Sequence, residues 1–180
     1  MPGCLASCLL AVTLCEALLA QCWRQGGNKP MTHAFSIDEG VALLAASPLF
    51  AGIDAARLRV LIYAADPVSI SAGKFIVRQG SSEPAAWLVL KGEAEGWLDE
   101  EPALKLSIGR GALIGEGAMI AGLHHRMHVR ATDDMELLRF SRELFQRVCE
   151  EFPEVGRTVM ANYATRMADI ASALKTLLPE

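Results

Sequence analysis

The sequence is poor in the residues that would build a disulfide framework or a nucleic-acid surface. Only one cysteine, Cys149, lies outside the first 22 residues, so no disulfide scaffold is expected and a reducing, cytoplasmic setting fits best. The net charge is −4 and basic residues are scattered, which excludes a global electrostatic footprint for nucleic acid. No nucleophile–base pair, Walker loop or Rossmann fingerprint is visible, so the sequence indicates no enzyme.

The chain begins with an apolar stretch, residues 4–22, which holds the other four cysteines and is interrupted by Glu16. It has no Lys or Arg in front of it, unlike a secretory signal peptide, and it is marginal in length for a membrane span. Three interpretations stay open for residues 1–30: a spurious or disordered extension with translation starting at Met31, a signal or lipoprotein leader, or a membrane anchor. We therefore expect one domain, over residues 31–180.

Two short helices are expected at the start of this domain. Ser36 and Glu39 have the spacing of a capping box, and Pro48 breaks the helix that follows. Asp54 is placed to cap a second helix, which ends at Asp66-Pro67. Apolar residues at helical spacing in both segments predict that each helix packs one face against a core.

Between residues 68 and 140 the apolar residues alternate or form short runs, which is typical of strands. Turn signals recur about every 8 to 12 residues, which favours an antiparallel sandwich or roll over residues 67–140. Helices are expected over about 141–178, with Ser141 as a cap and Pro153 between them. Four glycines mark turns in which a positive φ is expected: Gly73, Gly80, Gly92 and Gly111.

One glycine-rich segment, Ile114-Gly115-Glu116-Gly117-Ala118, carries chemistry that the turn glycines lack. Backbone N–H groups that such a segment leaves free are able to surround an anion. The Glu116 carboxylate beside them can accept hydrogen bonds from a sugar hydroxyl group. The segment therefore favours a small anionic ligand that also carries hydroxyl groups.

The spaced glycines, the short strands and the Gly115–Ala118 segment together resemble cyclic-nucleotide-binding domains, the sensor lobe of catabolite-activator-like proteins. The resemblance implies an α+β, mainly β fold: an antiparallel double-stranded β-helix (β-roll or jelly roll) flanked by N-terminal helices and a long C-terminal helix. It also implies that Glu116 takes the ribose 2′-hydroxyl of cAMP or cGMP, with Gly115, Gly117 and Ala118 at the phosphate.

The residues after this segment depart from the family's phosphate-binding pattern, which is a proline-arginine pair, then small residues and a Ser or Thr. Counted without a gap, His124 falls on the proline, His125 on the arginine and His128 on the Ser or Thr. Arg126 comes one place late and would reach phosphate only through a bulge in the following strand. The implied ligand-binding set is Gly115, Glu116, Gly117, Ala118, His125, Arg126 and His128, either as a nucleotide site or as a degenerate one.

The last helix carries a long apolar stripe, from Val155 to Leu177, at three- and four-residue steps. A small roll does not readily cover so much apolar surface, and in the resembled family this helix pairs two subunits, so a homodimer is expected. The expected seam consists of Val159, Tyr163, Met167, Ile170 and Leu174. Packing of this helix onto the chain's own roll is the alternative.

The sequence leaves no room for a helix-turn-helix domain after this helix, so direct DNA binding is not expected.

The expected function is non-catalytic sensing: cAMP, cGMP or another small anionic ligand binds, and the C-terminal helix signals it. The alternative is a degenerate pocket in a domain that serves dimerisation or protein interaction. A metal site of His124, His128 and an acidic residue such as Glu116 is a third interpretation, but the His-x-His spacing of a cupin is missing. Apart from a cyclic nucleotide as ligand we expect no cofactor and no metal, and no membrane contact unless the N-terminal stretch is a leader.

Overall fold

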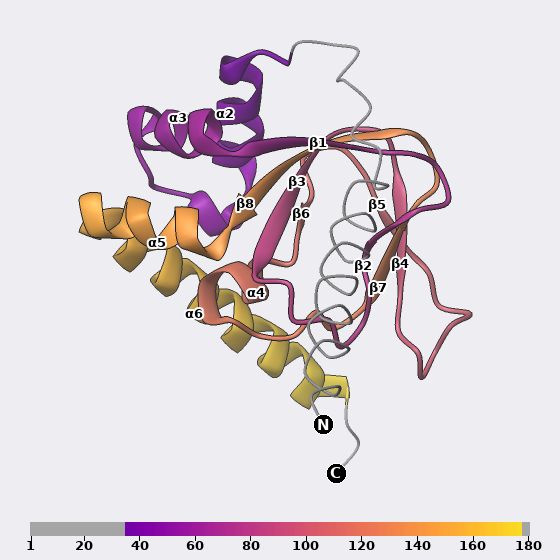
Figure 1. Ribbon diagram of the computed structural model, residues 1–180. Helices are drawn as coiled ribbons and strands as arrows, with labels where there is room; N and C mark the ends of the chain where they lie inside the picture. Colours follow the sequence, from indigo (N-terminus) through magenta and orange to yellow (C-terminus); the bar gives the residue numbers. More distant parts are fainter. Residues whose placement is uncertain (1–34, 178–180) are drawn as a thin grey trace, which may run out of the picture.

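The computed structural model describes residues 35–177, with side chains through residue 172 (Figure 1). The interpretations offered for residues 1–30, and the start at Met31, concern residues outside this range.

The strands are preceded by two α-helices and a 3₁₀ turn: α2 (Ile37–Ala46), η1 (Pro48–Phe50) and α3 (Ala55–Ala64). Asp54 caps α3 as predicted, because its carboxylate accepts a hydrogen bond from the Ala56 amide at 3.2 Å. The capping box predicted for α2 does not form. Ser36 occupies the cap position without a side-chain hydrogen bond, and Glu39 pairs with Arg110 instead. Arg110, which is distant in the sequence, thus binds the Glu39 carboxylate that the local spacing predicts at the helix start.

Eight strands lie in the described part of the chain: β1 (Asp66–Ile70), β2 (Phe75–Val77), β3 (Ala85–Lys91), β4 (Ala94–Trp97), β5 (Leu106–Ile108), β6 (Leu113–Ile114), β7 (His128–Ala131) and β8 (Met135–Ser141). All pairs are antiparallel. They form sheet A, in the order β1-β8-β3-β6, and sheet B, in the order β2-β7-β4-β5. The predicted β-roll with flanking helices is confirmed. The four turn glycines have φ between +79° and +85°, as expected.

Sheet A is the middle layer of the domain, with sheet B on one face and the helices on the other (Figure 1). Strand β3 shows why, because its alternate residues belong to two different cores. Ala85, Trp87 and Val89 pack between the sheets, whereas Ala86, Leu88 and Leu90 pack against the helices. A strand buried on both faces reads as a continuous apolar run rather than as an alternating one.

Two helices close the domain, α5 (Arg142–Glu151) and α6 (Pro153–Leu177), and a short helix, α4 (Glu116–Ala121), lies between β6 and β7. The Ser141 hydroxyl caps α5 by accepting a hydrogen bond from the Leu144 amide at 3.1 Å. Cys149 is half-buried in α5, and burial raises the pKa of its thiol, as suits a packing residue. Within residues 35–177 no helix is both long and apolar enough to cross a membrane.

Helix α6 runs across the helical side of the domain, beneath α4 and α5 (Figure 1). Its first half is anchored, because Val155 and Val159 are buried in the helical core. The Asn162 amide donates two hydrogen bonds at 3.0 Å, to the carbonyl oxygens of Leu49 and Ala51 at the end of η1. The helix therefore belongs to the domain and reaches the residues of the candidate site described next.

Candidate functional site

The candidate site is built around a left-handed turn at Gly115, between β6 and α4. Gly115 has φ +81°, a conformation that residues with a side chain rarely adopt. Its neighbours leave no space for one either: an added Cβ would lie 2.6 Å from His125 Cε1 and 2.9 Å from the Ala85 carbonyl oxygen. The turn therefore requires glycine for two independent reasons, and it brings the predicted site residues Gly115 and His125 into contact.

The amide of Ala118 does not face outward from this turn. The Ala118 and Met119 amides both donate to the Gly115 carbonyl oxygen, at 3.0 and 3.3 Å, and the Ala118 side chain is buried. Of the amides in the segment, those of Glu116 and Gly117 belong to the first turn of α4 and have no partner within the helix. The expectation that the amides of the segment are free for an anion therefore does not hold for Ala118.

Glu116 is held by the C-terminal helix. Its carboxylate lies 3.1 Å from an Nη atom of Arg166 on α6, and the Glu116 side chain is only 17% exposed. The Arg166 side chain is 45% exposed, so water reaches one side of this ion pair and Glu116 is its more sheltered partner. Glu116, to which the resemblance assigns the ribose, thus also contacts α6, the helix expected to signal ligand binding.

Gly117 allows a second contact between the same two elements. A Cβ at this position would lie 2.9 Å from the Tyr163 hydroxyl oxygen, so a side chain here would displace the end of the Tyr163 side chain. The space that a side chain at residue 117 would fill is taken by the end of the Tyr163 side chain.

His125 is one of the few buried polar residues in the described part of the chain, with 5% of its surface exposed. Its Nε2 atom lies 2.9 Å from the Glu83 carbonyl oxygen, and its ring packs against Trp87 with the centroids 5.6 Å apart. Its backbone amide donates to the Ser81 carbonyl oxygen at 3.0 Å. The ring is therefore fixed in place beside the Gly115 turn.

Arg126 has the opposite environment. Strand β7 starts only at His128, so Arg126 lies in the loop before it and not in a strand, as the register argument had assumed. Its side chain is exposed and forms no hydrogen bond or ion pair with any other described residue. Arg126 as a ligand-binding residue stays a prediction.

His128 lies at the start of β7, on the face of sheet B that points away from the core. Its Nδ1 atom accepts a hydrogen bond from the Gln79 amide at 3.3 Å, and its Nε2 atom lies 2.8 Å from an Asp99 carboxylate oxygen. The ring packs against Phe75 and Trp97, with centroids 5.9 and 5.3 Å away. Both ring nitrogens thus have protein partners, and His128 does not join His125 at the Gly115 turn.

His124 is exposed, with Nδ1 lying 3.1 Å from the Gly80 carbonyl oxygen. Among the described residues no group of three or more His, Cys, Asp and Glu side chains is placed to hold a metal ion. The arrangement therefore lends no support to the metal interpretation of the histidine cluster.

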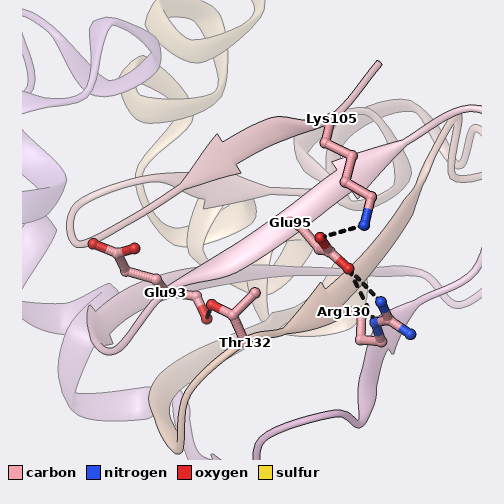
Figure 2. Close-up of polar contacts among 5 residues, drawn as sticks. All are labelled: Glu93, Glu95, Lys105, Arg130 and Thr132. Carbon is pink, nitrogen blue, oxygen red and sulfur yellow. Dashed lines mark hydrogen bonds and ion pairs between the residues drawn. The ribbon is translucent and has the colours of Figure 1, made fainter. Parts of the chain in front are cut away.

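The outer face of sheet B carries a charge cluster that sequence reasoning missed. Figure 2 shows Glu95 of β4 between Lys105 and Arg130 of β7, and the Lys105 distance is 2.8 Å. Both cations pack near Trp97 as well. Their hydrogen bonds to Glu95, that of Lys105 first, hold the pKa of this carboxyl below its usual range. The cluster fastens neighbouring strands and does not contact the Gly115 turn.

The predicted seam on α6 separates into two parts. Val159 is fully buried and Tyr163 packs against the domain's own core, so the seam expectation is wrong for Val159. The reason is that the first half of α6 covers the domain itself, which was the alternative interpretation of the stripe. Met167 and Ile170 are 37% and 47% exposed, and Leu174 lies in the part of α6 whose side chains are outside the described range.

Arg166 is the site residue that sequence reasoning did not single out. A charged residue one turn beyond Tyr163 on an otherwise apolar stripe indicates a partner on the surface that the stripe covers. Two cavities among the described residues, of about 610 and 230 Å³, lie beside Arg110 and beside Thr158, and the Gly115–Ala118 segment lines neither of them.

The two antiparallel sheets and their flanking helices define a β-roll domain, and comparison with known proteins identifies its family. The family model for the cyclic nucleotide-binding domain matches residues 67–152. Residues 67–152 therefore form a domain of the cyclic nucleotide-binding family.

The solved structures that resemble the domain agree. A cyclic nucleotide-binding-like protein from Brucella abortus is 28% identical with a TM-score of 0.56, covering 63% of this chain and 99% of its own. The catabolite activator protein of Thermus thermophilus is 25% identical with a TM-score of 0.63, covering 73% of this chain and 63% of its own. A cyclic nucleotide-binding domain from Methylobacillus flagellatus, at 19% identity and a TM-score of 0.65, covers 80% of this chain and 85% of its own and shows the same fold.

Curated relatives include the lysophospholipase nte1 of Aspergillus fumigatus, 31% identical over 134 residues, or 72% of this chain. The chain spans only 9% of the length of that relative. The similarity thus concerns one small part of the enzyme.

Proposed function

We propose that this domain is a non-catalytic sensor that binds cAMP, cGMP or another small anionic ligand at the Gly115 turn and signals through α6. The observation that carries the proposal is the contact between Glu116 and Arg166, 3.1 Å apart, which joins the candidate ligand residue to the C-terminal helix. Membership of the cyclic nucleotide-binding family supports the ligand class.

The chemistry of the coupling follows from the carboxylate of Glu116. A ribose hydroxyl would donate to one of its two oxygens while the Arg166 guanidinium holds the other. A hydrogen bond from the ligand lowers the negative charge on the Glu116 carboxylate that Arg166 contacts. The ligand also excludes water from the Glu116–Arg166 ion pair, which strengthens the attraction between the two charges. Binding therefore changes how firmly α6 is held against α4, which Tyr163 and Gly117 already bring together.

Isothermal titration calorimetry with cAMP and cGMP at physiological salt tests ligand binding. We expect saturable binding by the unaltered protein and at least about tenfold weaker binding by Glu116→Ala, the usual size for losing a charge-assisted hydrogen bond. Glu101→Ala is the matched control, because Glu101 is exposed on the β4–β5 connection, away from the site. The absence of binding by the unaltered protein with either nucleotide would refute a cyclic-nucleotide sensor.

Hydrogen exchange of α6 tests the signalling step. Saturating ligand should change amide protection in α6, and Arg166→Gln should abolish most of that change while retaining part of the binding. Arg157→Gln, an exposed change on the same helix, serves as the control. If α6 exchanged at the same rate with and without ligand, the coupling through Glu116 and Arg166 would be rejected even if binding were tight.

A second candidate function, a dimerisation or protein-interaction module without a nucleotide, is favoured by the exposed apolar residues of α6. Met160, Met167 and Ile170 are 52%, 37% and 47% exposed. A second copy of the chain would cover them by pairing its own α6. In sedimentation velocity, Ile170→Glu should then be a monomer where the unaltered protein is a dimer. Tyr63→Glu is the control, because Tyr63 is exposed on α3, and it should remain a dimer. An unaltered protein that sediments as a monomer at micromolar concentration contradicts this function.

We further propose a cytoplasmic location, no direct DNA contact and no cofactor beyond the ligand. The single half-buried cysteine of the described residues supports a reducing compartment. The scattered basic residues and the net charge of −4 argue against a DNA surface.

A further inference from the structure

The cavity of about 610 Å³ is lined by residues of α2 and of the turns that join β3 to β4 and β7 to β8. Its volume lies in the range of small-molecule sites, roughly 300 to 1,000 Å³. Because the Gly115–Ala118 segment does not line it, a ligand held here would be separate from the one proposed above.

One part of the lining is apolar. Leu90, near the end of β3, is only 5% exposed and belongs to the helical core, and Phe35 packs against the same core. Both residues line the cavity. The apolar body of a ligand, such as a ring or a branched chain, would therefore be removed from water on contact with Leu90 and Phe35.

The rest of the lining is mainly charged, with four carboxylates and two cations: Glu39, Glu93, Asp133 and Glu136, and Lys91 and Arg110. Glu39 and Arg110 pair with each other. The side chains of Lys91, Glu93 and Asp133 are exposed and form no hydrogen bond or ion pair with any other described residue. The cavity thus offers free charges of both signs next to an apolar surface.

Glu93 and Asp133 are held close together by the backbone. The Thr132 and Asp133 amides both donate to the Glu93 carbonyl oxygen, at 2.9 and 3.3 Å, and the Thr132 hydroxyl donates to it at 2.9 Å. Figure 2 shows that the Glu93 side chain points away from the Glu95 cluster. A positive group in the cavity would be attracted by both carboxylates and would relieve their mutual repulsion.

We propose that this cavity binds a small zwitterion with an apolar body, such as an apolar α-amino acid. Its ammonium group lies between Glu93 and Asp133, its carboxylate pairs with Lys91, and its side chain packs on Leu90 and Phe35. Because carboxylates outnumber cations in the lining, the ammonium group of the ligand contributes more to binding than its carboxylate does. The site is independent of the Gly115 turn.

An NMR titration of the unaltered protein with L-phenylalanine tests this assignment, through the amide signals of residues 90–93 and 132–133. We expect saturable shifts there. Phenylalanine amide, which lacks the carboxylate, should bind about threefold more weakly. N-acetylphenylalanine, which lacks the ammonium group, should bind at least about tenfold more weakly, the usual size for losing charge-assisted hydrogen bonds. Glycine, which lacks the apolar body, should also bind at least about tenfold more weakly.

Two variants assign the charges of the ligand to side chains. Glu93→Gln keeps the backbone hydrogen bonds of the turn and should weaken phenylalanine binding about fivefold. Lys91→Met should bind phenylalanine and its amide with equal affinity, because the partner of the carboxylate is gone. Glu101→Gln, a change at an exposed carboxylate on the β4–β5 connection, is the control and should bind as the unaltered protein does.

The absence of shifts at residues 90–93 and 132–133, up to the solubility limit of phenylalanine, would overturn the site. Equal affinity for the three phenylalanine compounds, or an unchanged affinity in Glu93→Gln, would overturn the recognition of a zwitterion. Neither result bears on the calorimetry with cAMP, which depends on Glu116 and not on this cavity, so the two proposals fail separately.

Discussion

Two residues that the sequence separates by ten positions depend on each other at the candidate site. Gly115 needs its left-handed conformation and its missing side chain because His125 and Ala85 occupy the space beside it. His125 in turn needs that space to keep its ring buried against Trp87. The turn and the buried histidine therefore form one unit, and a change at either residue disturbs both.

Gly115→Ala should lower the free energy of unfolding by about 2 to 4 kcal/mol, since it combines left-handed backbone strain with overpacking. Gly73→Ala is the matched control, because Gly73 has nearly the same φ, +79°, but no atom within 4 Å of an added Cβ. It should cost only about 1 to 2 kcal/mol, the strain alone. Urea unfolding followed by circular dichroism measures both, and equal losses for the two variants would contradict the contact with His125.

At the scale of whole elements, the N-terminal caps of α2 and α5 differ. Ser141 and Ser36 both occupy the N-cap of a helix, yet only Ser141 makes the side-chain hydrogen bond to the helix backbone. Helix α5 continues directly from β8, a central strand of sheet A, whereas at α2 the carboxylate expected to complete the capping box, that of Glu39, pairs with Arg110.

Ser141→Ala should therefore lower the free energy of unfolding by about 1 kcal/mol, the usual cost of losing a cap. Ser36→Ala should lower it by only about 0.3 kcal/mol, because no cap hydrogen bond is lost. Urea midpoints at neutral pH, with the slope of the unfolding transition unchanged, give the comparison. A larger loss for Ser36→Ala than for Ser141→Ala would show that the cap hydrogen bonds are assigned to the wrong helix.

Ion pairs between different segments of the chain make the stability of the whole domain depend on pH. Lys105 and Arg130 lower the pKa of Glu95, and Arg57 bridges two helices by pairing with Glu154. The pKa of Glu154 is lowered by its own backbone amide first and then by Arg57. Carboxyl groups whose pKa is lower in the folded state contribute stability above their unfolded pKa, about 4.3 for glutamate, and lose it as pH falls through the folded value.

Unfolding by urea should accordingly shift to lower urea concentration between about pH 5 and pH 3. In Glu95→Gln the urea midpoint should shift less between these pH values than in the unaltered protein, because one carboxyl group with a lowered pKa has been removed. Glu101→Gln, whose side chain forms no ion pair with the described residues, is the control. Identical pH profiles for Glu95→Gln and the unaltered protein would indicate that the cluster in Figure 2 adds nothing to stability.

Local patterns predicted most of the elements and the family, because short apolar runs, turn glycines and cap residues are local signals. They placed the strands between residues 67 and 140, and Asp54 and Ser141 at helix starts. They failed where a distant residue competes, as for Glu39, and where the start of a strand had to be known to one residue, as for Arg126 before β7.

The sequence by itself determined the short strands with their turn glycines, the caps at Asp54 and Ser141 and the amphipathic C-terminal helix, since each depends on neighbours within a few positions along the chain. Only the tertiary structure decided that Val159 faces the domain's own core, that Arg166 meets Glu116 and that His125 rather than His128 lies at the turn. These facts depend on the path of α6 and of the loop before β7 across the roll, and packing between distant segments sets that path.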